Sequence, residues 1–556
     1  MTKLLMFLTS LLAMLLLLSG CSQLQTRQSQ TNKIVKSDNQ CFVADSNTTL
    51  ANIEKSRCYT FASPSLRSEK RDVFFSEEYK SIAKRRTKKK FGSTPVGQRP
   101  KKMIGLALSG GGMRANAFHL GILAGLEEFK ISNYEGKSLL DRIDYISSVS
   151  GGSWALGAYL FNDDLCDQSN IFRTCENCGI INDRLPHYLL FRQGALSREG
   201  WRKEIHEDFV PASDVLYVDL HKEKHLKDKP YFIINSTHSA KVWELGSDEN
   251  FNFQFTRDGF GTFVDCLSGN GKEYCGSLRR FRWKFLKHGL GKGFFIKNPN
   301  DPQAKLKIRI NEWLTSGEFT LPVHVSDIIA ASSAVVSKAY GMYIRVSVDH
   351  EAEWNKRNGI REQYRLSDGG KSENIGVLPL VERGVQLIIA SQMAEDAKMK
   401  FEDLDRLNSH VNRHFGVKID TEVIKSTIRG DDKSPAKLYA VSNIQHSFKE
   451  STPSSKLLFI KPTYGNITNF KLWLTSQSET KEKKERSFFK DIIDALKNDK
   501  NNTGRSGPCF SSQFPQNTTS CGEYDKRLIY AYYLLGRYII LNTSVGAEIS
   551  TYAILK

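Results

Sequence analysis

The run of residues 148–154, Ser-Val-Ser-Gly-Gly-Ser-Trp, places one serine where a nucleophile would stand. It follows an apolar segment at 143–149 that is typical of a buried strand, and it precedes a helix-like segment. A strand that turns sharply into a helix through small residues holds a serine hydroxyl in the open, at the positive end of the helix dipole. The pattern predicts a nucleophile elbow at Ser150, with acyl transfer as its chemistry.

Two further motifs could supply what such a serine needs, which is a base for its proton and N–H donors for an oxyanion. Residues 110–114, Gly-Gly-Gly-Met-Arg, lie between a strand-like segment at 103–108 and a helical pattern at 114–129. Residues 368–370, Asp-Gly-Gly, follow much later. Alone, the first motif also fits a flexible turn or a nucleotide-binding loop, and the second a plain turn. Together and in this order they predict a serine hydrolase.

These motifs resemble those of the patatin-like phospholipase family, and in detail its relatives among the cytosolic phospholipases of animals. The resemblance rests on residues 110–114, on Ser-Gly-Gly-Ser-Trp at 150–154, and on Leu-Ser-Asp-Gly-Gly at 366–370 with Glu-Asn-Ile-Gly at 373–376. It covers residues 102–160 and about 326–391. It implies a Ser-Asp dyad without histidine, in which Ser150 is the nucleophile and Asp368 the base.

The same resemblance assigns further roles around the dyad. The N–H groups of Gly111, Gly112 and Gly151 would form the oxyanion hole, and Arg114 would face the phosphate or the oxyanion. The elbow departs from the common Gly-x-Ser-x-Gly pattern, because Ser148 stands where a glycine is usual. Serine is the next smallest residue of this kind, so the elbow is expected to tolerate it.

Other polar residues near these motifs are expected to pack rather than to react. His119 lies on the helix after the glycine loop. Ser332 and Ser333 belong to a small-residue segment that resembles one near the family's active site. All three are interpreted as packing residues.

Alternating strand and helix patterns predict an α/β fold, a three-layer sandwich with a mostly parallel central sheet. The patatin-like catalytic domain is expected at 101–395, with a long insertion at about 161–325, and a C-terminal extension at 396–556 is expected to pack on it. Further strands are predicted at 385–391 and 456–460, and helices at 488–497 and 523–541. Ser150 and Asp368 would meet at the carboxyl edge of the sheet. The insertion is rich in aromatic residues, which favour packing; by resemblance it would form a lid or an acyl-chain cleft.

The N-terminus has the pattern of an export signal. A run of apolar residues at 4–18 is too short for a comfortable membrane span and ends in Leu-Ser-Gly-Cys at 18–21. This ending resembles a bacterial lipobox, so residues 1–20 are interpreted as a lipoprotein signal peptide and Cys21 as the acylated (palmitate-bearing) N-terminus. Ser22 favours the outer membrane of the cell envelope. The alternative is an ordinary signal peptide with a chance cysteine.

The remaining nine cysteines suit an oxidising compartment and predict disulfides rather than a metal site. One Cys-x-x-Cys at 175–178 stands without a second such pair, so no metal is expected. Three local disulfides are predicted, with a fourth involving Cys166 and leaving one free thiol; the cysteines concerned are Cys41 with Cys58, Cys266 with Cys275, Cys509 with Cys521, and the group Cys166, Cys175 and Cys178.

The net charge of +18 is partly concentrated at residues 84–90, Lys-Arg-Arg-Thr-Lys-Lys-Lys, within a stretch at 21–100 that is interpreted as a polar tether. Each basic side chain near an anionic lipid surface is worth about 1 kcal/mol, so this run could hold the catalytic mouth on a membrane. The alternative is a solvated linker. Nucleic acid is not expected as a partner, because no aromatic-studded binding motif accompanies the charge.

The sequence therefore predicts an exported, lipid-anchored phospholipase or lysophospholipase that hydrolyses acyl esters of glycerophospholipids at a membrane surface. The chemistry requires no cofactor and no calcium. Two alternatives stay open: an acyltransferase that uses the same dyad, and a catalytically silent lipid-binding lipoprotein of the envelope. A Ser150 Oγ to Asp368 carboxylate distance of about 3 Å would argue against the silent protein.

Overall fold

The structure is a computed structural model. It describes residues 75–161, 198–210, 223–242, 247–257, 324–334, 360–446, 455–480, 483–501, 514–517 and 526–554, apart from a few single positions, and the strands between residues 259 and 350. The expected signal peptide, Cys21, Cys41, Cys58, the cysteines at 166–178, Cys509 and Cys521 lie outside the described residues. So do the side chains of Cys266 and Cys275, whose backbones lie in strands.

The helices of one or more turns are α4 Ser76–Lys88, α5 Gly112–Glu128, α6 Leu139–Arg142, α7 Gly151–Phe161, α8 Arg198–Phe209, η5 His225–Lys227, α9 Val325–Ser332, η6 Gly369–Lys371, α11 Leu378–Glu382, α12 Glu402–Phe415, α13 Thr421–Arg429, α14 Thr468–Thr480, α15 Lys483–Asn501, α16 Lys526–Asn542 and α17 Ser544–Ile554. The strands are β1 Ile104–Leu108, β2 Tyr145–Val149, β3 Tyr231–Val242, β4 Ser247–Thr256, β5 Gly259–Thr262, β6 Cys266–Gly269, β7 Lys272–Cys275, β8 Phe281–Arg282, β9 Phe294–Lys297, β10 Lys305–Leu314, β11 Gly317–Leu321, β12 Met342–His350, β13 Ile360–Asp368, β14 Leu387–Ser391, β15 Val417–Ile419, β16 Tyr439–His446 and β17 Ser455–Ile460.

One large mixed sheet has five parallel strands at its centre. They run in the order β3, β2, β1, β14, β17, and antiparallel strands continue the sheet on both sides, from β13 outward and from β16 outward. The residues of β1, β2 and β14 are all buried, because a central parallel strand is covered on both faces and therefore needs an apolar run. The expected α/β class with a parallel core is confirmed.

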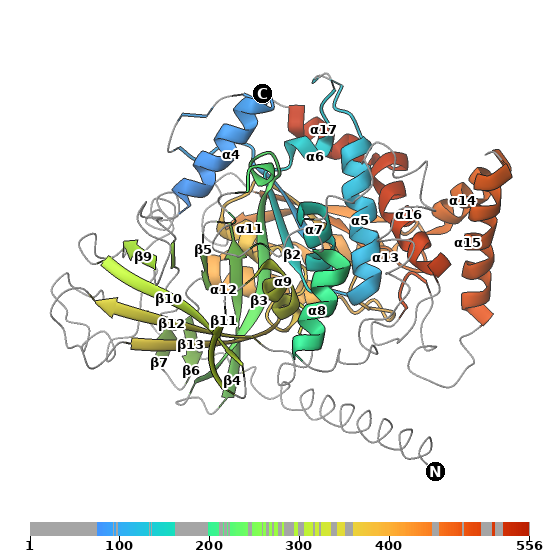
Figure 1. Ribbon diagram of the computed structural model, residues 1–556. Coiled ribbons are helices and arrows are strands. Elements are labelled where there is room, and N and C mark those ends of the chain that lie inside the picture. Colours follow the sequence, from blue (N-terminus) through green and yellow to red (C-terminus); the bar gives the residue numbers. More distant parts are fainter. Residues whose placement is uncertain are drawn as a thin grey trace, which may run out of the picture. The chain divides into compact units, whose positions relative to one another are not determined.

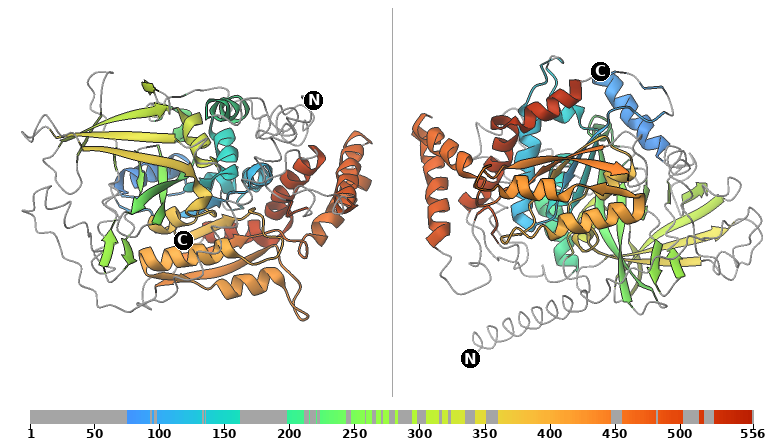
Figure 2. Two further views of the ribbon diagram at one scale, coloured as in Figure 1. Left: turned by 90° about the horizontal axis from the view of Figure 1, so that it is seen from below. Right: turned by 180° about the vertical axis from the view of Figure 1, so that it is seen from behind.

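Two separate apolar cores lie on the two faces of this sheet, which gives three layers (Figure 1). Helices α5, α7, α8, α9 and α16 contribute to the core on one face. Helices α4, α11, α12 and α13 contribute to the core on the other face, where the right-hand view of Figure 2 shows α12 and α13 in orange across the strands. Alternate residues of β1 enter the two cores, Leu106 one and Ala107 the other.

The predicted element bounds hold within a few residues, but the interpretation of one segment is corrected. Residues 161–325 are not wholly an insertion, because β3 lies in the middle of the sheet, parallel to β2. The C-terminal extension at 396–556 contributes β17 to the parallel sheet beside β14, and its helix α16 packs on α5. β6 and β7 pair only with each other and form part of a second compact unit.

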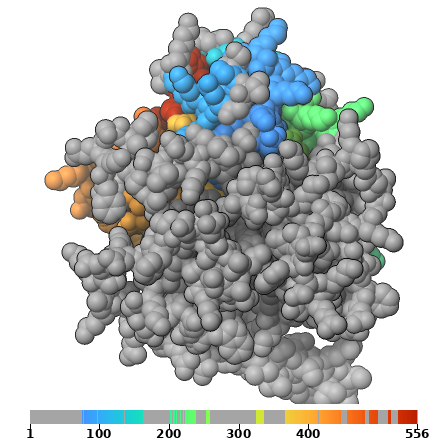
Figure 3. Space-filling view, turned by 90° about the vertical axis from the view of Figure 1, so that its left-hand side faces the viewer, coloured from blue at the N-terminus to red at the C-terminus, as the bar shows by residue number. Residues whose placement is uncertain are grey.

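The interpretation of residues 21–100 as a polar tether is wrong for α4, which is part of the folded domain. Arg85 and Arg86 are buried. The guanidinium of Arg86 lies 2.5 Å from the carboxylate of Asp144, and Arg142 lies 3.0 Å from the same group. Lys88, by contrast, is exposed and pairs with Asp228. Figure 3 shows the blue α4 region at the surface of the molecule, beside a green segment. Arg85 and Arg86, two of the seven residues of the basic run, are therefore buried and cannot contact a membrane surface.

The contact between α5 and α16 brings two helix backbones close together. A side chain at Gly121 would meet the carbonyl oxygen of Tyr533 at 2.0 Å, and one at Gly536 would meet the carbonyl oxygen of Phe118 at 2.2 Å. Only glycine permits this approach. Helix α5 carries the glycine loop at its N-terminus, so the far end of the sequence supports the site.

Within the described residues, no helix combines the length and the apolar composition that a transmembrane span requires.

Candidate active site

Ser150 stands at the sharp turn between β2 and α7, as the sequence predicts. Its φ is +50°, in the left-handed region that non-glycine residues rarely adopt. The turn packs closely against β1 and the glycine loop. A side chain at Gly151 would meet the carbonyl oxygen of Gly112 at 2.2 Å, and a side chain at Gly152 would meet the carbonyl oxygen of Leu108 at 2.4 Å. The two glycines let the serine project at the N-terminus of α7 while the backbone packs against the glycine loop.

Buried hydrogen bonds hold the strained elbow from below. The N–H of Ser150 donates to Ser332 Oγ at 3.1 Å, and Ser332 Oγ donates to the carbonyl of Asn235 at 2.5 Å. Ser148 is satisfied by Ser153, with 3.0 Å between the two Oγ atoms, which explains why a serine is tolerated where glycine is usual. Ser332 therefore does more than pack: it fixes the backbone of the nucleophile.

The structure brings the predicted dyad together. Ser150 Oγ donates to Asp368 Oδ2 at 2.8 Å. Asp368 ends β13, and its other oxygen accepts the N–H of Gly370 at 2.7 Å, which fixes the carboxylate. Burial raises the pKa of Asp368, and the hydrogen bonds from Gly370 and Ser150 oppose this rise. A carboxylate with a raised pKa is a stronger base toward a hydroxyl proton.

The glycine loop, residues 109–112, lies against the dyad. Gly111 has a φ of +136° and Gly112 one of +61°. A side chain at Gly110 would lie 3.3 Å from Ser150 Cβ. The N–H groups of Gly111, Gly112 and Gly151 have no hydrogen-bond partner within the described residues, since each stands at or before the start of a helix. These donors are thus available near the nucleophile.

Arg114 is not placed to contact the phosphate of a lipid, while its expected role toward the oxyanion stays a prediction. Its side chain is fully buried, and its Nε donates to the carbonyl of Met393 at 2.8 Å. A side chain without accessible surface cannot face the phosphate of a substrate in this conformation. The burial has a local reason: Arg114 is the third residue of α5, in the first turn of that helix, where it supports the loop from behind.

His119 packs, as expected. It is fully buried, its Nε2 lies 3.0 Å from the carbonyl oxygen of Ser391, and burial lowers its pKa to about 3, so it is neutral and remote from proton transfer. No cluster of metal-binding side chains is found in the part of the chain that the structure describes.

Sequence reasoning missed Asn235, which completes the elbow's support. Its Nδ2 donates to Ser147 Oγ at 2.9 Å and to the carbonyl of Ser148 at 2.8 Å. The only signal was its place in the apolar strand β3, where a buried amide needs partners.

Among curated proteins, the chain is similar to the phospholipases B of Cryptococcus neoformans var. neoformans and var. grubii, with 44% identity over 62 and 61 residues. These matches cover 11% of this chain and 10% of each relative, so the chain spans about a tenth of the length of the curated relatives that it matches.

Among solved structures, human GIVD cytosolic phospholipase A2 aligns with a TM-score of 0.47 and 12% identity, over 87% of this chain and 64% of that chain. The same human protein in complex with methyl gamma-linolenyl fluorophosphonate aligns with a TM-score of 0.41 and 13% identity, over 88% of this chain and 64% of that chain.

The family model of the patatin-like phospholipases matches residues 106–381, a range that contains the elbow, the glycine loop and the Asp-Gly-Gly turn. The resemblance of the motifs is thereby confirmed, and residues 106–381 of this chain form a domain of the patatin-like phospholipase family.

Proposed function

We propose that this protein is an acyl-ester hydrolase of glycerophospholipids, a phospholipase or lysophospholipase, that acts through a dyad of Ser150 and Asp368. The observation that carries the proposal is the 2.8 Å hydrogen bond from Ser150 Oγ to Asp368 Oδ2 at a strained elbow within a patatin-like domain. This geometry speaks against a catalytically silent lipid-binding protein. The name phospholipase B of the matched curated relatives agrees with a lipid ester as substrate.

In the proposed mechanism Ser150 Oγ attacks the ester carbonyl carbon while Asp368 takes the hydroxyl proton. The carbonyl oxygen becomes an oxyanion, and the N–H groups of Gly111, Gly112 and Gly151 stabilise it; removal of one such donor typically costs about 10²- to 10³-fold in rate. The tetrahedral intermediate collapses with cleavage of the C–O bond of the ester. The leaving alkoxide takes the proton from Asp368, and the acyl group stays on Ser150.

Water completes the cycle by the same route. Asp368 accepts a proton from a water molecule that attacks the acyl-enzyme, a second oxyanion forms in the same hole, and collapse returns the proton to Ser150 Oγ and releases the fatty acid. The side chains supply each proton transfer.

We further propose that the protein is exported and anchored by acylation of Cys21 in the cell envelope, with the outer membrane as its site. The support is the lipobox pattern at 18–21 after a short apolar run. An anchored enzyme would work on lipids of the membrane surface that holds it or faces it. Incorporation of labelled palmitate into wild-type protein and not into Cys21→Ala would support the anchor; equal labelling of both would refute it.

The test of activity is fatty acid release from mixed phospholipid vesicles by the full chain. We expect Ser150→Ala to abolish release and Asp368→Asn, which keeps the size of the side chain, to lower it about 10²- to 10⁴-fold. Ser476→Ala and Asp432→Asn, at exposed positions, are the matched controls and should behave like wild type. Release should be indifferent to a metal chelator.

Two results would overturn the proposal. If Ser150→Ala released fatty acid as fast as wild type, Ser150 would not be the nucleophile. Transfer of the acyl group to an added alcohol, with no free fatty acid from any lipid, would make the protein an acyltransferase.

A further inference from the structure

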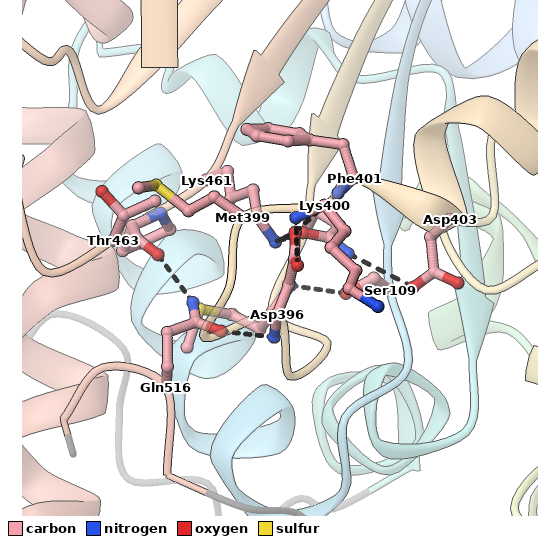
Figure 4. A network of polar contacts seen from close by, with 12 residues as sticks. Ser109, Asp396, Met399, Lys400, Phe401, Asp403, Lys461, Thr463 and Gln516 are labelled. Carbon is pink, nitrogen blue, oxygen red and sulfur yellow. Dashed lines mark hydrogen bonds and ion pairs between the residues drawn. The ribbon is translucent and has the colours of Figure 1, made fainter. Parts of the chain in front are cut away.

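A buried lysine lies behind the glycine loop, outside the dyad and its donors. Lys461 follows β17 and is 1% exposed. Its Nζ donates to Gln392 Oε1 and lies 3.4 Å from Asp396 Oδ2. Figure 4 shows Lys461 and Asp396 together with Ser109 of the glycine loop. An ammonium so deeply placed is costly unless its partners are fixed.

Asp396 is held in place by other groups. Its carboxylate accepts the N–H groups of Lys400 at 2.7 Å and Phe401 at 3.0 Å, and its own N–H donates to Gln516 at 2.7 Å. The ammonium of Lys461 also lies over the ring of Phe401, 5.6 Å from its centre. The lysine therefore binds a rigid anionic site.

The first route from Lys461 to the glycine loop runs through Gln392 and its neighbour Met393. The N–H of Met393 donates to Ser109 Oγ at 2.7 Å, and the carbonyl of Met393 accepts Arg114 Nε. The same carbonyl oxygen would lie 2.6 Å from a side chain at Gly111. The segment that Lys461 holds is thus the surface on which the loop rests.

The second route runs through Asp403. Its Oδ2 accepts Gln392 Nε2 at 3.3 Å and Asn374 Nδ2 at 2.9 Å. The carbonyl of Asn374 accepts the N–H of Gly110 at 2.9 Å. A side chain at Gly110 or at Gly370 would meet Asn374 Oδ1 at 2.1 or 2.6 Å, so Asn374 fills the space between the loop and the turn of the base.

The charge of Lys461 depends on its surroundings. Burial lowers its pKa to about 8, while the nearby carboxylates of Asp396 and Asp403 raise it and the guanidinium of Arg114 lowers it. The ammonium is thus present at pH 7 and is lost as the pH rises above about 8. Its loss leaves the two carboxylates to repel each other, and it weakens the hydrogen bond to Gln392 because a neutral amine is a poorer donor than an ammonium.

We propose that Lys461 is a positioning residue of the oxyanion hole, which acts through Gln392, Asp403 and Asn374 to hold the glycine loop at the distance from Ser150 that the reaction needs. The inference rests on the proposed function, because it assigns the loop to the oxyanion. It assigns a role to residues that do not touch the substrate: because the glycines of the loop have no side chains to hold them, the residues that pack against the loop have to fix its position.

The test is the rate at which an alkyl fluorophosphonate labels Ser150 of the full chain between pH 6 and 9. In this reaction the Oγ–P bond forms, the P–F bond breaks, fluoride leaves and the hydroxyl proton passes to Asp368, so the rate reports the dyad and the oxyanion hole without reference to a lipid. The variant is Lys461→Met, which keeps the length of the side chain without its charge. Lys456→Met, at an exposed position near the start of β17, the strand that precedes Lys461, is the matched control.

For wild type we expect the labelling rate to fall as the pH rises through about 8. Lys461→Met should be labelled about 10- to 100-fold more slowly at pH 7, without that alkaline decline, because misplacement of a catalytic group by 1 Å costs as much as 10²-fold. On the vesicle substrate its kcat should fall while KM changes little. Asn374→Ala should be slower but should keep the decline, because Lys461 still titrates.

Hydrogen exchange separates positioning from general stability. In Lys461→Met, exchange should rise in peptides covering residues 104–116 and stay unchanged in those covering 145–161. The inference is overturned if a folded Lys461→Met protein is labelled at the wild-type rate. It is also overturned if the labelling rate of wild type stays level from pH 7 to 9, a result that does not depend on whether the variant folds. If Ser150 is labelled by the fluorophosphonate but the protein cleaves no lipid, only the proposed substrate is refuted. If wild type is not labelled, the proposed dyad fails and exchange in the loop still decides the role of Lys461.

Discussion

The buried pair of Arg86 and Asp144 allows a quantitative test of the conclusion that α4 is part of the catalytic domain. Arg86 Nε lies 2.7 Å from Asp144 Oδ1, Nη2 lies 2.5 Å from Oδ2, and Nη1 donates to the carbonyl of Lys101 at 2.8 Å. The carboxylate of Asp144 is inaccessible and the side chain of Arg86 is 7% exposed. Removal of one partner of a buried ion pair costs about 3–5 kcal/mol, because the other charge stays buried. Because Arg142 still lies 3.0 Å from Asp144, we expect Arg86→Met to lower the free energy of unfolding by an amount near the lower end of about 3–5 kcal/mol.

The assay is urea unfolding followed by tryptophan fluorescence, with a control on the same helix. Lys88 pairs with Asp228 at 2.6 Å, but the two side chains are 65% and 41% exposed. Lys88→Met should therefore cost no more than about 1 kcal/mol. The contrast between the two variants separates a folded, integral helix from a solvated linker, in which both substitutions would be silent.

The same pair predicts a pH dependence. Burial alone would raise the pKa of Asp144, but Arg86 and Arg142 outweigh it and hold this pKa below its usual value. Its stabilisation is present above the unfolded pKa of about 3.9 and is lost as the pH falls through the lower folded pKa. Arg86→Met should raise the folded pKa and move acid unfolding to higher pH. If Arg86→Met lowered the free energy of unfolding by less than about 1 kcal/mol, as is expected of Lys88→Met, the conclusion that α4 is an integral helix would be refuted.

Three further variants test other features. Ser332→Ala removes the acceptor of the Ser150 N–H, and we expect about 1–3 kcal/mol less stability with slower labelling of Ser150; an unchanged labelling rate would contradict its support of the elbow. Gly121→Val places a side chain against the carbonyl of Tyr533 and should cost about 1–3 kcal/mol or more in thermal unfolding; an unaltered Tm would contradict the close helix contact. Burial raises the pKa of Glu373 to about 7, so its protonated form favours folding and its contribution declines as the pH rises from about 4.3 to 7. The stability of wild type relative to Glu373→Gln should fall between about pH 4 and pH 7, and a constant difference would count against this.

The elbow and the turn of the candidate site could be predicted from the sequence because they depend on local patterns. A strand, a serine and two glycines specify the elbow within seven residues, and the steric contacts of Gly151 and Gly152 explain why these positions need glycine. The Asp-Gly-Gly turn is equally local, since Asp368 accepts the N–H of Gly370 two residues later. The apolar runs of β1 and β14 predicted the parallel core for the same reason.

What the sequence could not show depends on partners distant in the chain. The basic run at 84–90 looks like a linker until Asp144, 58 residues from Arg86, is found beside it. Arg114 was expected to face the phosphate or the oxyanion, whereas the carbonyl that accepts its Nε belongs to Met393, 279 residues away. β3 looked like part of an insertion, because nothing in its composition tells that it pairs with β2. Spacing along a chain does not encode such contacts.

The glycine contact between α5 and α16 has a consequence for the order in which the protein can be made. The helix that begins at the glycine loop packs, backbone to backbone, on a helix that starts at residue 526. A growing chain folds from its N-terminus, and contacts between residues so far apart form late because closing a long loop costs entropy. The nucleophile and the loop are synthesised early, but α5 lacks its supporting helix until residue 542 has been translated. A chain whose synthesis stops before residue 526 would therefore lack the helix that packs on α5, and its candidate site would be left without that support.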